Sequence, residues 1–341
     1  MKTNEYNIND FYFHDQDGYK LNPKGMALIC YYYRTKHNLN NLFAASNYLE
    51  LENIIRTLLI QGSTQRFGVV YRNIPNHGIG FSHKCAVIVQ GDEIIVLDPF
   101  GGYNGNINFA RMGAEYIRFM FEKLGRSNIR IYTPKLRVQS DLSSCSTLCF
   151  LFLKEALRMG DELINFLRSA NLLDEEDDLP PNLAKYTQKT SYLDNVKKNG
   201  LLNKYPNHHD YQIPIRSNKR QQETTKTTET LWQYVQSHQK YRPSEINPAA
   251  TNRAAKHIKI INNYLDTLTL DELEKILQET SNPTEQLLLT INQLSSDNLI
   301  RTQPSIKEIL PKYDVSEDSF DVFSFLNSDD EITKLYKPPS P

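Results

Sequence analysis

The stretch SHKCAVIVQGDEIIVLDPFGG (82–102) carries the pattern that decides the fold. It contains two short runs, 83–89 and 93–98, that are rich in valine and isoleucine, as β-strands are. Between them, Gln90-Gly91-Asp92 supplies the small, polar residues of a tight turn. The sequence therefore predicts a β-hairpin, in which the start of the first strand lies beside the end of the second.

A histidine opens the first of these strands, and an aspartate closes the second, 15 residues later. In an antiparallel hairpin both positions lie at the same end, so we expect His83 and Asp98 to be in contact. A carboxylate on one ring nitrogen fixes the tautomer of a histidine and stabilises its protonated form. Each residue alone is more often structural, so a catalytic interpretation depends on a third group.

Cys145 supplies that third group. It directly precedes STLCFLFLKEALRM (146–159), a run that is apolar nearly all round and predicts a buried helix. A helix N-terminus stabilises a thiolate, and a neighbouring imidazole can take the thiol proton. Gln139 lies six residues earlier, close enough for its amide to reach an oxyanion formed there. We therefore expect a catalytic dyad of His83 and Cys145, oriented by Asp98.

Composition excludes several classes of protein. The 341 residues include 39 Lys or Arg and 40 Asp or Glu, and this balance argues against a broad nucleic-acid surface. No segment is apolar enough to span a membrane, and the polar N-terminus does not resemble a secretory signal. Four cysteines in a chain of this length do not suggest a disulfide framework. We expect a soluble, monomeric, cytoplasmic protein without a metal or other cofactor.

Cysteine and glycine divide the chain. All four cysteines lie within the first 150 residues, and all 14 glycines lie at or before Gly200. We therefore expect a catalytic domain (1–170) of mixed α/β structure, a polar linker (171–225), a helical accessory region (226–315) and a flexible tail (316–341). Within them, strands are expected at 66–73 and 129–133, and helices at 23–37, 41–61, 109–124, 227–242, 248–268, 270–279 and 283–296.

The order His83, Asp98, Gln139, Cys145 resembles the clan CE cysteine peptidases. This clan includes adenovirus protease, the SUMO proteases, bacterial deubiquitinase effectors and the YopJ-type acetyltransferases. The segment LDPFG (97–101) is similar to the acidic-residue turn of the adenovirus-type members. The spacing of Gln139 and Cys145, followed by an apolar helix, is similar to the clan's nucleophile motif.

The resemblance covers roughly residues 65–160 and has three departures. Lys84 follows the histidine where many peptidase members have Trp. Ser144 and Ser146 flank the cysteine where Asp and Gly are usual. These changes leave the nucleophile chemistry intact, because none of these positions transfers the proton.

The resemblance implies an α+β fold: a papain-like or ubiquitin-like-protease core with a mixed sheet flanked by helices, extended by a C-terminal helical region. It implies a cysteine isopeptidase that removes ubiquitin or a ubiquitin-like modifier from conjugates, using Cys145, His83 and Asp98 with Gln139 as oxyanion donor. It is also typical of bacterial effectors, such as deubiquitinases, that are delivered into a host cytoplasm.

Three alternatives stay open. A YopJ-type Ser/Thr/Lys acetyltransferase would use the same triad, and would need an acetyl-CoA pocket and a basic inositol-phosphate site. A papain-like deamidase or transglutaminase-like enzyme would use Cys30 as nucleophile with the same His83 and Asp98. A binding module on an inactive scaffold would lack a triad member. The candidate basic site of the first alternative consists of Arg216, Lys219, Arg220 and Lys226.

Overall fold

The fold is that of a computed structural model. The residues it describes are 6–15, 18–60, 66–73, 83–101, 109–134, 136–141, 143–169, 179, 181–189, 191–193, 212–214, 228–238 and 248–281. Among these residues, no helix combines the length and the apolar character that crossing a membrane requires.

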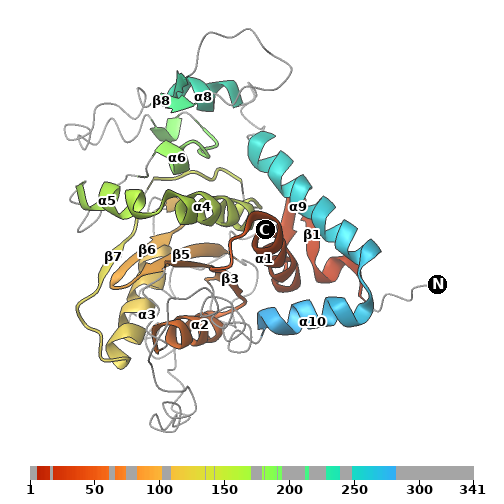
Figure 1. Ribbon diagram of the computed structural model, residues 1–341. Helices are drawn as coiled ribbons and strands as arrows, with labels where there is room; N and C mark the ends of the chain where they lie inside the picture. The colour runs from red at the N-terminus through yellow and green to blue at the C-terminus, as the bar shows by residue number, and fades with distance from the viewer. Residues whose placement is uncertain are drawn as a thin grey trace, which may run out of the picture.

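A mixed five-stranded sheet lies at the centre of the fold (Figure 1), with strand order β3-β4-β5-β6-β7. The outer strands β3 and β7 run parallel to their neighbours, and the inner pairs are antiparallel. The expected hairpin is confirmed, because Gln90 pairs with Glu93 across a turn in which Gly91 has a φ of 62°. The strands are β3 (Leu42–Ala45), β4 (Phe67–Arg72), β5 (Lys84–Gln90), β6 (Glu93–Leu97) and β7 (Arg130–Tyr132).

The inner strands are nearly continuous apolar runs because both faces of the sheet are covered. Along β5, Cys85, Val87 and Val89 belong to the core on one face. Ala86 and Ile88 belong to the core on the other face. Successive side chains of β5 therefore point to opposite faces of the sheet. His83, which directly precedes β5, lies between the hydrophobic cores on these two faces.

Helices cover both faces of the sheet. Helix α4 (Cys145–Met159) crosses one face over β4 and β5, while α2 (Tyr48–Ile60) and α3 (Phe109–Lys123) cover the other. Further helices pack on the outer side of α4, which explains why its sequence is apolar nearly all round. The expected helices at 109–124 and 146–159 are therefore confirmed to within one residue at each end.

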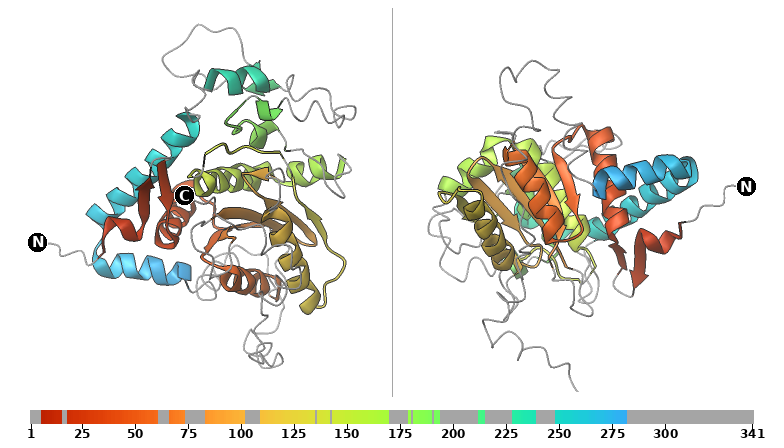
Figure 2. Two further views of the ribbon diagram at one scale, coloured as in Figure 1. Left: turned by 180° about the vertical axis from the view of Figure 1, so that it is seen from behind. Right: turned by 90° about the horizontal axis from the view of Figure 1, so that it is seen from below.

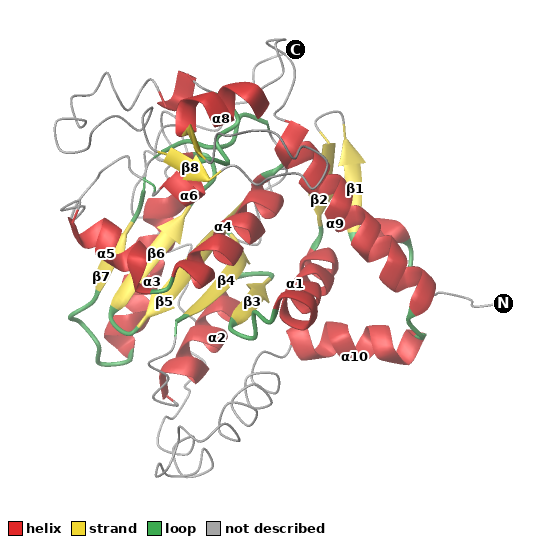
Figure 3. Cartoon of the chain, turned by 45° about the horizontal axis from the view of Figure 1, so that its top comes forward, coloured by secondary structure: helices red, strands yellow, loops and turns green. Residues whose placement is uncertain are grey.

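The C-terminal helices pack on the N-terminal part of the chain. Helix α1 (Pro23–His37) contacts β3, and α9 (Pro248–Thr267) and α10 (Leu270–Ser281) pack against α1. Strands β1 (Tyr12–Asp15) and β2 (Gly18–Leu21) form a hairpin whose second strand contacts α9. Figures 2 and 3 show this group of elements at the end of the molecule away from α3.

An aromatic cluster joins α1, α4 and α9. The Tyr33 ring stacks on Phe150, with 5.8 Å between ring centroids and an interplanar angle of 17°. The Tyr33 hydroxyl lies 3.1 Å from Nε2 of the buried His257. Burial, together with the charge of Arg253 and Lys256, lowers the pKa of His257 to about 3. The imidazole is therefore neutral and acts as a packing and hydrogen-bonding group.

The first part of the expected helix 41–61 is instead a strand. Residues 42–45 form β3, and all four of their side chains are buried. A short apolar run is ambiguous between a buried strand and a helix when only its periodicity is considered. The helix begins later because Asn47 caps it: its side-chain oxygen accepts the Glu50 main-chain N–H at 2.8 Å.

Part of the stretch expected to be a polar linker packs into the core. Leu183, Thr187 and Gln188 are buried, and the Gln188 main-chain N–H donates to the Val138 carbonyl at 2.8 Å.

The expected helix at 227–242 begins instead as a short strand. The expected helix 283–296 and the tail 316–341 lie outside the described residues. The remaining described elements are η1 (Ile8–Asp10), α5 (Asp161–Ser169), α6 (Pro181–Ala184), β8 (Gln212–Pro214), β9 (Thr228–Thr230) and α8 (Leu231–His238).

Candidate active site

His83 and Asp98 meet at one edge of the central sheet. His83 directly precedes β5 and Asp98 directly follows β6, and the pairing of Ala86 with Leu97 brings these strand ends together. The His83 Nε2 lies 2.7 Å from Asp98 Oδ1, and both side chains are buried. The Phe100 main-chain N–H also donates to Asp98 Oδ1 at 2.8 Å. The carboxylate therefore fixes the orientation of the imidazole ring and leaves Nδ1 as the nitrogen that is free to accept a proton.

Cys145 is the first residue of α4, and His83 lies close enough to its thiol to lower the pKa of that thiol. Because Nε2 is occupied by Asp98, Nδ1 is the ring nitrogen available to the thiol. The structure thus brings the three expected groups into one continuous series, from carboxylate to imidazole to thiol. This is the arrangement that nucleophilic cysteine catalysis requires.

The electrostatics favour a charged pair. Burial raises the pKa of the Cys145 thiol, but the hydrogen bond to His83 and the positive charge of Lys84 outweigh it and lower the pKa below its ordinary value. Burial lowers the pKa of His83, but the charge of Asp98 outweighs it and raises this pKa well above the ordinary value. The two shifts together stabilise a thiolate beside an imidazolium ion.

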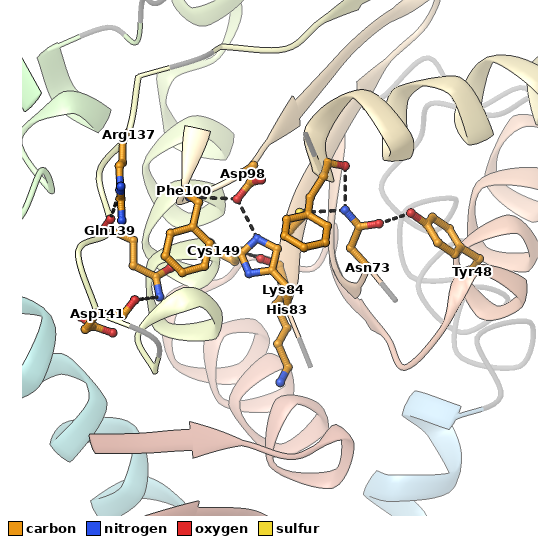
Figure 4. Close-up of polar contacts among 12 residues, drawn as sticks. Tyr48, Asn73, His83, Lys84, Asp98, Phe100, Arg137, Gln139, Asp141 and Cys149 are labelled. Atoms are coloured by element: carbon orange, nitrogen blue, oxygen red, sulfur yellow. Dashed lines mark hydrogen bonds and ion pairs between the residues drawn. The ribbon is translucent and has the colours of Figure 1, made fainter. Parts of the chain in front are cut away.

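Two aromatic rings enclose the imidazole. The Phe100 ring stacks on His83 with 4.9 Å between centroids and an interplanar angle of 24° (Figure 4). The Phe109 ring contacts His83 with a centroid distance of 4.6 Å. Rings on both sides restrict rotation of the imidazole and keep water from its faces. The base is therefore held in one orientation.

Asp141 shapes the loop that leads into Cys145. Its Oδ1 accepts the main-chain N–H groups of Ser143 at 2.8 Å and Ser144 at 2.6 Å. Its Oδ2 accepts the Gln188 side-chain amide at 2.6 Å. Sequence reasoning missed both residues. An aspartate shortly before two serines and a helix was an available signal for a capping turn, whereas nothing in the sequence marks Gln188.

Gln139 is fully buried beside this loop. Its Nε2 donates to the Asp141 carbonyl at 2.7 Å, and its main-chain N–H donates to the Pro99 carbonyl at 2.8 Å. An amide nitrogen carries two hydrogens, so one remains for a further acceptor. The residue is thus tied both to the nucleophile loop and to the turn that carries Asp98.

The other described cysteines have different surroundings. The Cys30 thiol donates to the Leu42 carbonyl at 3.2 Å, and burial raises its pKa. The Cys149 thiol donates to the Lys84 carbonyl at 3.3 Å, and burial raises its pKa as well. Cys145 differs from both because it begins α4 and its pKa is lowered, so the site favours Cys145 over Cys30 as the nucleophile.

Metal-ligating atoms also gather here. The donor atoms of His83, Cys85 and Asp98 lie within 4.8 Å of one another and offer the nitrogen, sulfur and oxygen that zinc accepts. However, His83 and Asp98 are already bonded to each other at 2.7 Å. A metal ion would have to replace the bond that orients the base. We therefore interpret this set as the hydrogen-bond network of the dyad.

These pKa directions predict selective alkylation of Cys145. Iodoacetamide should label it at pH 6–7 faster than Cys30, Cys85 or Cys149, because only its thiolate persists below the usual thiol range. Peptide mass spectrometry across pH measures the rate at each site. A labelling rate for Cys145 that rises only at pH 8–9, as for an ordinary thiol, would contradict the charged pair.

Basic side chains from three helices gather near the C-terminal part of α4. Lys154 and Arg158 belong to α4, Arg253 and Lys256 to α9, and His37 ends α1. Burial and the charges of Arg158 and Arg253 lower the pKa of Lys154 to about 8. Burial and these neighbouring cations also lower the pKa of His37. The cations are therefore close enough to repel one another, as in a site for a multiply charged anion.

The acidic neighbour of this cluster is engaged elsewhere. Glu155 pairs with Lys185 at 3.7 Å and accepts the Tyr186 hydroxyl at 3.1 Å. Within the described part of the chain, no ion pair involves the four Lys and Arg residues of the cluster. The basic residues singled out from the sequence, Arg216, Lys219, Arg220 and Lys226, lie outside the described residues.

A cavity of about 320 Å³ lies between α1, β3 and α10, with Lys24, Met26 and Ala45 among its lining residues. Ala45 pairs with Tyr71, which pairs with Cys85. The cavity is therefore at the sheet edge that carries the dyad, two strands or roughly 10 Å away. It is large enough to take part of an organic substrate.

No protein-family model matches the chain, and no curated protein matches its sequence. Solved structures do match. AvrA delL154 with IP6 and CoA is 16% identical over 69% of this chain and 86% of its own, with a TM-score of 0.52. HopZ1a in complex with IP6 is 12% identical over 70% and 84%, with a TM-score of 0.47. The expected α+β fold, a mixed sheet flanked by helices, is therefore confirmed, and it is similar to the fold of AvrA.

Proposed function

We propose that the protein is an acyltransferase that moves an acetyl group from a coenzyme A thioester to a hydroxyl or amine of a protein, through Cys145. The observation that carries this proposal is the series of three groups at the sheet edge. The thiol at the first position of a buried helix has its pKa lowered by His83, whose Nε2 is held 2.7 Å from Asp98. Such a series forms and breaks a thioester under mild conditions.

The reaction has two balanced halves. The Cys145 thiolate attacks the donor carbonyl, the bond between that carbonyl and the coenzyme A sulfur breaks, and the His83 imidazolium protonates the departing thiolate. The acceptor oxygen or nitrogen then attacks acetyl-Cys145, His83 takes its proton, and the Cys145 thiolate leaves. Asp98 stabilises the imidazolium in both halves without receiving the proton.

Each half passes through a negatively charged oxygen. The N-terminal end of α4 directs main-chain N–H groups toward Cys145, and such groups stabilise an oxyanion. We assign the second amide hydrogen of Gln139 to the same oxygen. Its other hydrogen is bonded to the Asp141 carbonyl at 2.7 Å, which holds the amide in place.

Two further features support acyl transfer over hydrolysis. The basic cluster of α1, α4 and α9 suits a polyphosphate, and the cavity at the same sheet edge as the dyad suits part of a thioester donor. AvrA, whose fold this chain shares, has been solved with IP6 and CoA. We therefore assign IP6, inositol hexakisphosphate, to the cluster as an activating ligand.

The isopeptidase expected from the sequence is the second candidate. It is favoured by the buried contact of His83 with Asp98 in the LDPFG turn (97–101), the feature on which the resemblance to proteases rests. The same three groups would cleave an isopeptide bond if water, rather than an acceptor side chain, resolved the acyl-enzyme. The geometry of the nucleophile is common to both functions, so an assay has to separate them.

The test runs both chemistries on the full chain. The protein is incubated with acetyl-CoA, with and without IP6, and intact mass spectrometry detects acetyl-Cys145. In parallel it is incubated with ubiquitin and SUMO probes that carry a C-terminal electrophile. We expect an acetyl adduct on Cys145 that IP6 increases, and no probe adduct. A probe adduct on Cys145 without acetylation would replace the proposal with the isopeptidase.

Charge reversal in the basic cluster should abolish the response to IP6. Ligand binding to the folded state raises the unfolding temperature, so IP6 should stabilise the natural chain in a thermal melt. The double variant Arg253→Glu with Lys256→Glu should lose this shift, because it replaces two of the cations with anions. Lys259→Glu, at an exposed position of the same helix, is the matched control. If IP6 raised the unfolding temperature of the double variant as much as that of the control, the result would show that IP6 does not bind at this cluster.

A further inference from the structure

Asn73 is a buried amide at the edge of the sheet that carries the dyad. It directly follows β4, and the residue is 1% exposed. A buried amide without hydrogen-bond partners is costly, so its presence among apolar neighbours needs an explanation. Figure 4 shows it between Tyr48 and the imidazole of His83.

Every hydrogen-bonding group of the Asn73 side chain is engaged. Its Oδ1 accepts the Tyr48 hydroxyl, which comes from the first residue of α2. Its Nδ2 donates to the Phe109 carbonyl, at the first residue of α3, at 2.7 Å, and to Cys85 Sγ at 3.3 Å. One amide therefore joins the starts of two helices to β5.

The main chain of Asn73 makes a further contact. Its N–H donates to the His83 carbonyl at 3.0 Å, which extends the pairing of β4 with β5 by one residue. The residue thus holds His83 in two ways. It fixes the backbone of the histidine directly, and it fixes Phe109, whose ring contacts the imidazole at 4.6 Å.

We propose that Asn73 is the positioning residue that keeps the His83 imidazole aligned with Cys145. Phe100 follows Asp98 in the chain and is anchored by its own N–H, which donates to that carboxylate at 2.8 Å. Phe109 has no such anchor to the triad, and Asn73 provides one through the Phe109 carbonyl. Without this bond, the start of α3, which carries the Phe109 ring, loses its hydrogen bond to the end of β4.

The proposal rests on the Cys145–His83 pair of the proposed function and is independent of its substrate. Misalignment of the imidazole weakens the hydrogen bond and the charge interaction that lower the pKa of Cys145. A rise of one unit in that pKa reduces the thiolate fraction about tenfold at a pH well below it. The thiolate fraction of Cys145 therefore measures how well the His83 imidazole is aligned with it.

The experiment measures iodoacetamide labelling of Cys145 against pH in the full chain. For Asn73→Ala, we expect labelling at about pH 6.5 to fall roughly tenfold, with the rate at pH 10 unchanged, because only the thiolate fraction changes. A variant that loses stability without this shift in profile would show that the residue is structural only.

Asn41→Ala is the matched control. The Asn41 side chain donates to the Arg66 carbonyl at 2.6 Å, near the opposite end of β4, so its loss removes a similar amide bond far from the dyad. It should lower the melting temperature and leave the labelling profile unchanged.

Tyr48→Phe keeps the aromatic ring and removes only the hydroxyl bonded to Asn73. It should fold even if Asn73→Ala does not, and should shift the profile in the same direction by a smaller amount. A natural chain whose Cys145 has an ordinary pKa would overturn the dyad itself, and with it the proposed function. A lowered pKa in the natural chain that neither the Asn73 nor the Tyr48 variant changes would overturn the positioning role alone.

Discussion

Replacing Cys145 with alanine should reduce acetyl transfer by roughly 10⁴-fold or more while leaving the binding of coenzyme A and IP6 nearly unchanged. The thiol forms a covalent bond only during the reaction, so its contribution is to the transition state rather than to ground-state binding. Single-turnover formation of the acetylated product measures the loss. Isothermal titration with each ligand measures the affinities.

Cys30→Ala is the control for this experiment. Cys30 is buried in α1 and its thiol donates to the Leu42 carbonyl, so its removal should cost about 1 kcal/mol of stability and little activity. This pair of variants also separates the two nucleophiles considered from the sequence. Full activity in Cys145→Ala, with loss in Cys30→Ala, would move the site to α1.

Replacing His83 with alanine should cost nearly as much as removing Cys145, because both protons of the reaction pass through the imidazole. Asp98→Ala should cost less, since the carboxylate orients the imidazole and stabilises its charge without moving a proton. The three rates come from the same single-turnover assay, measured across pH. A larger loss for Asp98→Ala than for His83→Ala would show that the carboxylate has a role other than orientation.

The parts of the fold that the sequence predicted are those with a local signal. The hairpin follows from two apolar runs around Gly91, and α4 follows from a long apolar run after Cys145. Because the turn fixes the register, the contact of His83 with Asp98 also followed from local pattern. Residues 42–45 form a strand where the sequence predicts a helix, because a run of four apolar residues has too little periodicity to separate strand from helix.

The residues that support the site had no such signal. Asn73 and Gln188 are polar residues in unremarkable surroundings in the sequence, and their partners lie on other elements. The basic cluster likewise combines α1, α4 and α9, each of which carries only one or two of its basic residues. Such groups are defined by tertiary packing, which a single sequence without its fold does not reveal.

The site is assembled from segments that are distant along the chain, and this has a consequence for when the proposed nucleophile becomes reactive. His83 and Asp98 flank a hairpin, whereas Cys145 reaches them only when α4 docks on β5. Contacts of this kind form late, because long loops must close first. Until then Cys145 is an ordinary thiol, mostly protonated at neutral pH. In a newly made or unfolded chain, Cys145 is therefore a protonated thiol that reacts slowly with oxidants. It becomes a reactive thiolate only when the chain has folded.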